Sequence, residues 1–386
     1  MKRRLFYLFV LVFIGRCALA AAGREPTVAT APIYDQLGVR IPATLFKKPV
    51  YLIVDTGAGM TYIDAKYRDE LGASIDDMSV NTVTTTNVPV LLYHAPPLNI
   101  GGRSFNLDKV GCLDFSALRA ATGVPFAGML GMDLLQRYVI TFDPDQEQFS
   151  LTTNVPAIVK QRALAIPLTR ADNGKEEILQ LSARLNGSGP INLVLDSGAF
   201  DFLGLNQADW DKVFPDDKEP VVEDFNVGAD SKIVRSKAAR IRSLRIGASL
   251  YTNILVGLVS NPTSFSHIGD LFLRQHIAAL DVSNQVLYLL PSRHFGETNE
   301  LDMSGLHLLK LNSKIMAYMV DSNSPAFKAG IRDGAELVAI NGQPAGSVLL
   351  SDIRQILRKA DGMKISLEIK QAGQVKEANF RLKKRI

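Results

Sequence analysis

The feature that most constrains this 386-residue chain is an internal repeat. The segment VYLIVDTGA at residues 50–58 recurs as INLVLDSGA at residues 191–199, an offset of 141. Residues 130–151 also match residues 268–289 over 22 positions without a gap, at an offset of 138. Two ordered matches at nearly equal spacing are not expected by chance, and such self-similarity indicates repeated structural units. We therefore predict two copies of one fold.

Each copy has the pattern of a β structure. Short apolar or alternating runs are separated by turn signals such as Asn186-Gly187. Helical patterning is limited to short pieces near residues 131–138 and 269–276. We predict a mainly β fold in which the two lobes are related by a pseudo-twofold axis.

The same short turn closes the apolar run of each copy. It consists of Asp55, Thr56, Gly57 and Ala58 in the first copy, and of Asp196, Ser197, Gly198 and Ala199 in the second. In one copy alone, an Asp-Gly turn that only ends a strand would be as good an interpretation as a functional carboxylate. Two copies favour function, because lobes packed about a pseudo-twofold axis would bring Asp55 and Asp196 face to face.

This paired pattern resembles that of the pepsin and retropepsin aspartic proteases. In that family an Asp-Thr/Ser-Gly turn is followed by a hydrophobic-hydrophobic-Gly segment, here Met129-Leu130-Gly131 and His267-Ile268-Gly269. The resemblance covers residues 36–289, and the short lobes are more similar to retropepsins than to pepsin. It implies that Asp55 and Asp196 are catalytic and that the hydroxyls of Thr56 and Ser197 lock the two turns together. His267 departs from the hydrophobic residue of the family pattern.

The resemblance also implies the chemistry. Two carboxylates about 3 Å apart do not both ionise cheaply, so the aspartates of this family share a proton and activate a water between them. No metal, cofactor or covalent intermediate is required. The two aspartates are nearly equivalent by symmetry, so the sequence leaves open which one is protonated.

A family member also needs hairpins, called flaps, that cover the substrate. We predict them at residues 80–92 and 222–234, with tips at residues 84–87 and 228–230. Two similar flaps fit a retropepsin-like arrangement. Tyr93 comes too late to match the flap tyrosine of pepsin, which leaves substrate preference open.

The last part of the chain resembles a bacterial PDZ domain of the kind appended to exported proteases. The matching segments are residues 324–326, 329–331, 333–334 and 340–342. Such domains bind an extended peptide as an added strand, with its carboxylate in a nest of backbone N–H groups. The candidate carboxylate loop consists of Gly305, Leu306, His307 and Leu308. An ordinary first strand is an equally good interpretation of that segment.

Residues 1–20 have the build of a secretory signal peptide. A basic start precedes a ten-residue apolar run at residues 5–14, and Ala18-Leu19-Ala20 offers small residues at the cleavage spacing. A spanning helix needs about 20 apolar residues, so a retained membrane anchor is the weaker alternative. We expect export to a periplasmic or extracellular compartment, with no stable membrane anchor.

Once the leader is removed, net charge and cysteine content limit which binding partners and which disulfides are possible. The 43 basic and 39 acidic residues become 39 of each, because the leader holds four basic and no acidic residues. A near-neutral chain without a basic stripe is not expected to bind nucleic acid. Cys112 is then the remaining cysteine, so no intramolecular disulfide forms, and the five histidines show no metal-ligand spacing.

We therefore predict an exported aspartic endopeptidase, monomeric, that acts on polypeptide substrates and has a PDZ domain for a peptide ligand. The alternatives are a catalytically silent peptide-binding scaffold with protease-like lobes, and a homodimer that pairs two copies of Asp55. The complete second lobe argues against the homodimer. The predicted segments are the signal peptide 1–20, lobe 1 at 33–151, a linker at 152–168, lobe 2 at 169–289, a linker at 290–303 and the PDZ domain at 304–386.

Overall fold

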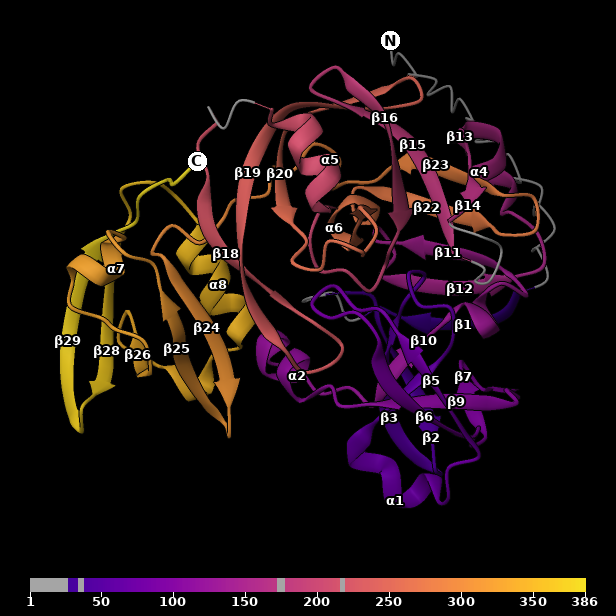
Figure 1. Ribbon diagram of the computed structural model, residues 1–386, viewed down its shortest axis with the longest axis horizontal. Coiled ribbons are helices and arrows are strands. Elements are labelled where there is room, and N and C mark those ends of the chain that lie inside the picture. The colour runs from indigo at the N-terminus through magenta and orange to yellow at the C-terminus, as the bar shows by residue number, and fades with distance from the viewer. Residues whose placement is uncertain (1–26, 34–37, 172–177, 216–218) are drawn as a thin grey trace, which may run out of the picture.

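The computed structural model describes residues 27–33, 38–171, 178–215 and 219–386. In this part of the chain the strands form four sheets with short helices between them, so the predicted mainly β class is confirmed (Figure 1). The predicted signal peptide, residues 1–20, lies outside the described residues.

The first lobe is built on a sheet with the strand order β5-β6-β9-β4-β10-β3-β2-β7-β8. Its strands are β2 (Arg40–Leu45), β3 (Lys48–Val54), β4 (Tyr62–Asp64), β5 (Asp76–Val80), β6 (Val88–His94), β7 (Leu98–Ile100), β8 (Arg103–Phe105), β9 (Lys109–Leu113) and β10 (Gly128–Leu130). Its helices are the 3-10 helix η1 (Ala65–Tyr67), α1 (Arg68–Leu71), α2 (Ser116–Thr122) and α3 (Met132–Leu135).

The second lobe repeats the plan on a sheet with the order β14-β15-β16-β21-β17-β20-β19-β18. Its strands are β14 (Thr169–Arg170), β15 (Leu179–Leu185), β16 (Ser188–Leu195), β17 (Leu203–Leu205), β18 (Val222–Val227), β19 (Ile233–Ile246), β20 (Ser249–Leu258) and β21 (His267–Ile268). Its helices are α5 (Gln207–Val213) and α6 (Asp270–Leu273). The apolar run before each aspartate forms a buried strand in both lobes, β3 and β16.

A third sheet joins the two lobes, in the order β1-β12-β11-β22-β23-β13. Its strands are β1 (Thr27–Pro32), β11 (Val139–Asp143), β12 (Gln148–Thr152), β13 (Leu164–Pro167), β22 (His276–Asp281) and β23 (Val286–Pro291). β11 pairs with β22 antiparallel, with Thr141 opposite Ala279. These two residues are equivalent at the repeat offset of 138, so the pseudo-twofold axis passes through this pair.

This shared sheet corrects two expectations. Residues 152–168 are more than a linker, because they hold helix α4 (Ala157–Arg162) and strand β13, which pairs with β23. Strand β1 lies before the predicted start of lobe 1 at residue 33, yet it pairs with β12. Sequence patterns did not reveal these two edge strands, since each finds its partner far along the chain.

The third unit has a sheet of its own, ordered β24-β25-β26-β28-β29 with β27 paired to β26. Its elements are β24 (Leu306–Leu311), β25 (Lys314–Val320), α7 (Pro325–Lys328), β26 (Ala335–Ile340), β27 (Gln343–Pro344), η2 (Ala345–Ser347), α8 (Leu350–Arg358), β28 (Lys364–Gln371) and β29 (Gln374–Arg381). Helix α8 covers the sheet with Ile353 and Leu357, which form a core with Ile340 and Leu367. This core is separate from the one that the two lobes share.

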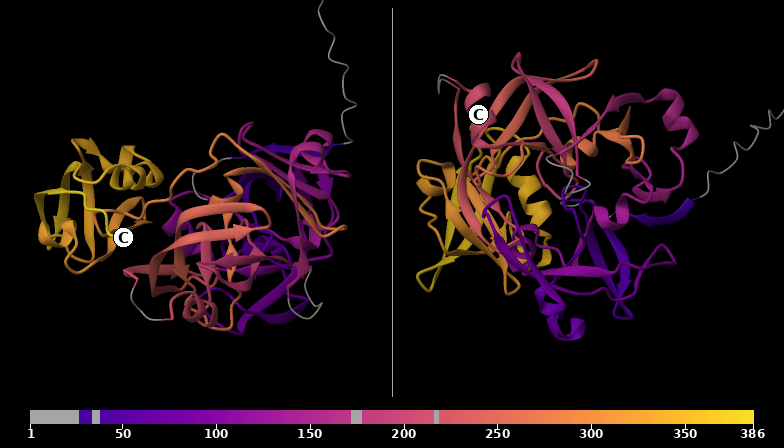
Figure 2. Two further views of the ribbon diagram at one scale, coloured as in Figure 1. Left: turned by 90° about the horizontal axis from the view of Figure 1, so that it is seen from above. Right: turned by 45° about the vertical axis from the view of Figure 1, so that its right-hand side comes forward.

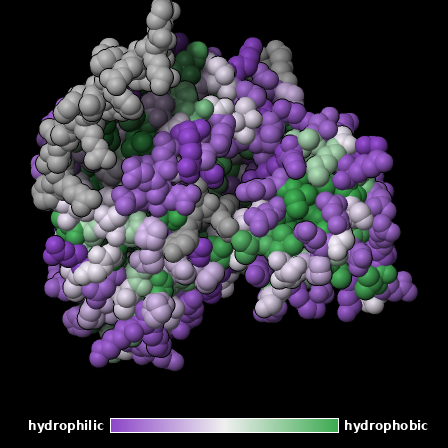
Figure 3. Space-filling view, turned by 180° about the vertical axis from the view of Figure 1, so that it is seen from behind, coloured by the Kyte–Doolittle hydropathy of each residue, from purple (hydrophilic) through white to green (hydrophobic). Residues whose placement is uncertain are grey.

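The third unit rests against the lobes on one side (Figure 2). Arg240 of β19 donates hydrogen bonds to the carbonyls of Asn299 and Ile386, at 2.9 and 3.2 Å, and to Glu300 Oε2 at 2.6 Å. Helix α2 of the first lobe packs beside β24. The segment 290–303, predicted as a linker, is therefore held by lobe 2. Seen from behind, the third unit shows apolar surface (Figure 3). Exposed apolar side chains of this unit include Leu311, Leu349 and Val375.

Candidate active site

Each aspartate stands at the end of a buried strand. Asp55 follows β3, and β10 runs parallel to β3, with Leu130 beside Val54. The Asp55 N–H donates to the carbonyl of Leu130 at 3.0 Å. In lobe 2 the Asp196 N–H donates to the carbonyl of Ile268, also at 3.0 Å. The two halves of the predicted motif, distant in sequence, thus meet in both lobes.

The turns orient the two carboxylates in the same way. Asp55 Oδ1 accepts from the Gly57 N–H at 2.9 Å, and Asp196 Oδ1 accepts from the Gly198 N–H at 2.9 Å. The Ala199 N–H adds a further bond to Asp196 Oδ1 at 3.0 Å. Such bonds hold each carboxylate in one orientation.

The turns also bring the two carboxyl groups into contact. A Cβ atom on Gly57 would lie 2.5 Å from Asp196 Cγ, and a Cβ on Gly198 would lie 2.5 Å from Asp55 Cγ. No side chain fits at either position, which explains why both turns have glycine there. Each glycine therefore lies against the carboxyl group of the opposite lobe, and the charge of Asp196 acts directly on Asp55. The structure therefore brings together the two residues that sequence symmetry singled out.

Thr56 and Ser197 connect the turns through four buried hydrogen bonds. The Thr56 N–H donates to Ser197 Oγ at 3.1 Å, and the Ser197 N–H donates to Thr56 Oγ1 at 3.0 Å. Each hydroxyl then donates across the lobe boundary, Thr56 Oγ1 to the carbonyl of Leu195 at 2.6 Å and Ser197 Oγ to that of Val54 at 2.7 Å. Both side chains are fully enclosed, at 1% and 0% exposure.

Burial and charge repulsion favour the protonated form of the pair. Burial, and then the negative charge of Asp196, raise the pKa of Asp55 well above its usual value. Burial also raises the pKa of Asp196, while the nearby cation of His267 acts in the opposite direction. A carboxyl pair that keeps one proton provides an acid and a base side by side.

A cavity of about 1260 Å³ contains both aspartates and is large enough for an extended peptide segment. The loops that follow β5 and β18 close over it, and Thr84 Oγ1 donates to Asp230 Oδ1 at 2.5 Å between their tips. The first predicted flap is longer than expected, because its hairpin begins at Asp76 rather than at residue 80. The second hairpin, β18 with β19, begins at Val222 as predicted.

The PDZ residues Gly305, Leu306, His307 and Leu308 do not form an open carboxylate loop. Gly305 has a left-handed φ of 77°, and the three residues after it belong to β24. Asp302 Oδ1 accepts from the N–H groups of Gly305 and Leu306, at 2.9 and 3.3 Å. A carboxylate of this chain therefore accepts from N–H groups that the predicted loop would offer to a peptide carboxylate.

The free edge of β24 is also partly covered. Arg354 Nη2 of α8 donates to the carbonyl of Leu308 at 2.6 Å, and α2 packs along the same strand. His307 is held by Asp321 Oδ1 at 2.8 Å and lies against the ring of Phe225. His307 and Leu308 line the cavity that also contains the aspartate pair.

Sequence reasoning missed Asp201. Both of its carboxylate oxygens lie 3.1 Å from His267 Nε2 at the wall of the cavity. The departure from the family pattern at His267 was visible in the sequence. Its partner was not, because Asp201 lies in the loop after the motif, where an acidic residue gives no signal.

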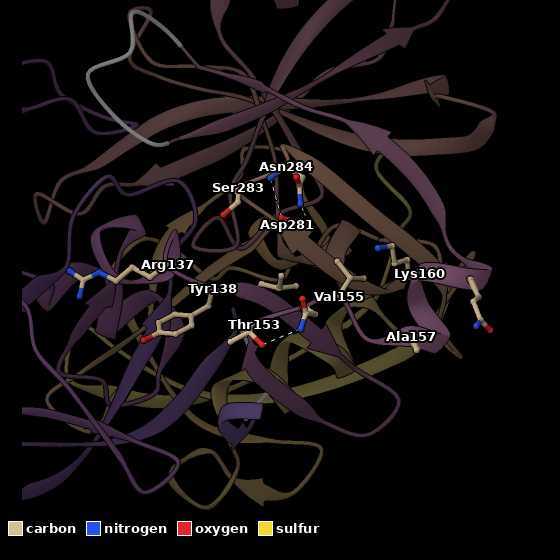
Figure 4. A pocket seen from close by; sticks show the side chains of 12 residues that line it. Arg137, Tyr138, Thr153, Val155, Ala157, Lys160, Asp281, Ser283 and Asn284 are labelled. Atoms are coloured by element: carbon tan, nitrogen blue, oxygen red, sulfur yellow. Dashed lines mark hydrogen bonds between the residues drawn. The ribbon is translucent and has the colours of Figure 1, made fainter. Parts of the chain in front are cut away.

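A second, smaller pocket of about 490 Å³ lies at the end of the shared sheet, where Tyr138, Lys160, Asp281 and Asn284 line it (Figure 4). Neither aspartate turn lines this pocket. Its polar groups satisfy one another in part, since Asn284 Nδ2 donates to Asp281 Oδ2 at 2.8 Å. The larger cavity is therefore the candidate active site.

The described residues lack two further features, a metal-ligand cluster and a membrane-spanning helix. They contain no group of three or more His, Cys, Asp or Glu side chains placed to hold a metal ion. None of the helices in the described ranges has the length and apolar character needed to cross a membrane.

Two lobes with matched aspartate turns, locked by reciprocal hydrogen bonds beneath paired hairpins, define a retropepsin-like arrangement. Comparison with known families agrees: the family described as Aspartyl protease matches residues 41–134, and the family described as PDZ domain matches residues 318–371. The chain thus contains an aspartyl protease-like domain and a PDZ domain. A search of curated proteins gave no match.

Proposed function

We propose that this chain is an exported aspartic endopeptidase whose catalytic residues are Asp55 and Asp196. The observation that carries the proposal is the close approach of two carboxyl groups, buried Asp55 and half-buried Asp196, each oriented by backbone N–H groups of its own turn. A structural aspartate at the end of a strand does not require a second carboxylate against it, because two buried carboxylates repel one another.

The proposed mechanism uses the shared proton. The ionised aspartate takes a proton from a water held between the two carboxyl groups, and the water oxygen bonds to the carbonyl carbon of the peptide. The protonated aspartate donates a hydrogen bond to the carbonyl oxygen, where negative charge develops. The C–N bond then breaks as the leaving nitrogen receives a proton from the pair.

The substrates would be unfolded or extended polypeptides, because the cavity lies beneath two hairpins and admits chain rather than folded protein. The PDZ unit would bind a peptide segment. Its place at one end of the same cavity supports a role near the substrate rather than as a distant recruiting arm. The proposal also includes export of the protein, which is supported by the sequence alone.

The decisive test compares Asp55→Asn and Asp196→Asn with the mature wild-type protein on a denatured substrate between pH 3 and 8, roughly the span in which such pairs titrate. We expect either variant to lose at least about 10²-fold in activity, because each removes an acid–base group. Asp108→Asn, an exposed change outside the cavity, is the matched control. Retained activity in either variant would contradict the single-chain catalytic pair. Peptide binding by a wild-type protein that never cleaves would favour the scaffold alternative.

Export is tested by N-terminal sequencing of the protein isolated from its producing cells. The small residues Ala18 and Ala20 predict cleavage near Ala21. A mature chain that still begins with Met1 would be incompatible with a cleaved leader.

A further inference from the structure

The two walls of the candidate active site differ in one chemically important position. By the repeat offset of 138, His267 of β21 is the equivalent of Met129 in β10, and both side chains line the cavity. By the offset of 141, Asp201 is the equivalent of Met60. Met60 and Met129 belong to an apolar cluster of the first lobe. The second lobe instead places a His–Asp pair where the first has two methionines.

The surroundings of the His267 ring favour its cationic form. Its Nε2 faces both oxygens of Asp201 at 3.1 Å. A carboxylate this close to the ring favours the protonated imidazolium over the neutral ring. Burial lowers the pKa of His267, but the charge of Asp201, its hydrogen bond to the ring and the charge of Asp196 outweigh burial and raise this pKa to about 9.

The backbone has room for this ring because of a glycine. A Cβ atom on Gly204 of β17, the strand beside β21, would lie 2.3 Å from His267 Cε1. Other charged groups near β21 are engaged elsewhere. Asp270 accepts from the Gly38 N–H at 2.9 Å, and Asp209 accepts from Ser266 Oγ at 2.7 Å. The His267–Asp201 pair is thus a built feature of this wall.

Asp201 keeps hydrogen-bonding capacity toward the cavity. Its side chain is 45% exposed although both oxygens contact His267, whereas the side chain of His267 is 7% exposed. A carboxylate has about four acceptor positions, so at least two stay available to a ligand. The aspartate pair adds a negative charge nearby, which favours a cationic donor over a neutral one.

We propose that Asp201, oriented by His267, is a specificity-determining residue that makes one of the two subsites flanking the scissile bond select a basic side chain. The equivalent subsite on the first lobe, with Met129, selects an apolar side chain. This inference rests on the proposed peptidase function and names the substrate class: extended peptides with lysine or arginine on one side of the cleaved bond and an apolar residue on the other.

The test uses peptides that are identical except for lysine or norleucine, its apolar analogue, at each of the two flanking positions. Binding is measured by calorimetry on Asp55→Asn protein, so the readout does not depend on cleavage. We expect lysine to bind about tenfold tighter than norleucine at one position and not at the other, as one charge-assisted hydrogen bond allows. Adding Asp201→Asn should remove that preference and leave norleucine binding within about twofold.

A second variant, Asp201→Met with His267→Met, copies the first lobe and should make both positions prefer norleucine. Asp108→Asn is the matched control for loss of a carboxylate away from the cavity. Any of three results would overturn the proposal. These are equal binding of the lysine and norleucine peptides to the Asp55→Asn protein, a lysine preference that survives Asp201→Asn, and no binding of either peptide. Cleavage by the wild-type protein is scored separately, so a failed specificity is distinguished from a failed peptidase.

Discussion

Replacing Thr56 by valine removes a hydroxyl without changing the shape of the side chain. Two of the four bonds between the aspartate turns are lost, those from the Ser197 N–H and to the carbonyl of Leu195. Both sites are closed to water, so the partners stay unsatisfied at about 1–3 kcal/mol each. We expect the free energy of unfolding to fall by about 2–4 kcal/mol, the lower part of that sum, because carbonyls tolerate a lost partner better than N–H groups do.

The loss is measured by urea unfolding, with the fluorescence of Trp210 as the probe. Trp210 is the single tryptophan of the chain and is 1% exposed in lobe 2, so its signal reports unfolding of that lobe. Thr56→Ser is the control, because it keeps the hydroxyl and removes only a methyl group. Ser197→Ala removes the other two bonds and should cost a similar amount.

Equal stability of the Thr56→Val and Thr56→Ser variants would refute the reasoning. It would mean that the turns are held by packing of the shared core and that the buried bonds contribute nothing net. The same variants should lower peptidase activity by more than their loss of folded protein explains, since the carboxyl groups depend on the turn geometry.

Two further outcomes are expected. The ring of His276 is kept neutral between the carbonyl of Phe272 and the hydroxyl of Tyr251, and burial lowers its pKa to about 4. The unfolded chain takes up a proton near pH 6.5, so this stabilisation is complete above pH 6.5 and is lost as pH falls toward 4, by up to about 3 kcal/mol. His276→Gln should make the urea midpoint depend less on pH in that range. An unchanged pH dependence would contradict a neutral, buried His276. In the PDZ unit, Asp302→Ala frees backbone N–H groups, so calorimetry should show tighter binding of a peptide with a free C-terminal carboxylate, but not of its amidated form. Equal affinities for Asp302→Ala and wild-type protein would show that the nest is not the obstacle.

The sequence predicted the two-lobed β fold and the meeting of Asp55 with Asp196 because both follow from one repeated pattern. Symmetry converts two local motifs into a long-range contact. No such rule applies to Asp302, whose carboxylate fills the PDZ nest from a segment that has the composition of a linker. The same holds for β13, a strand whose partner β23 is more than a hundred residues away. Contacts that occur once in the chain leave no periodicity or repeat to detect.

The pairing of β11 with β22 has a consequence for how the chain reaches its folded state. Ile140 lies opposite Leu280, the repeat equivalent of Phe142, and Phe142 lies opposite Ala278, the equivalent of Ile140. The edge of β11 is therefore complementary to itself. β22 is synthesised long after β11, and until then the first lobe presents an open sheet edge. Two unfinished chains that meet in that interval hold matching edges, so a symmetric dimer of first lobes is the misassembly that the second lobe must outcompete.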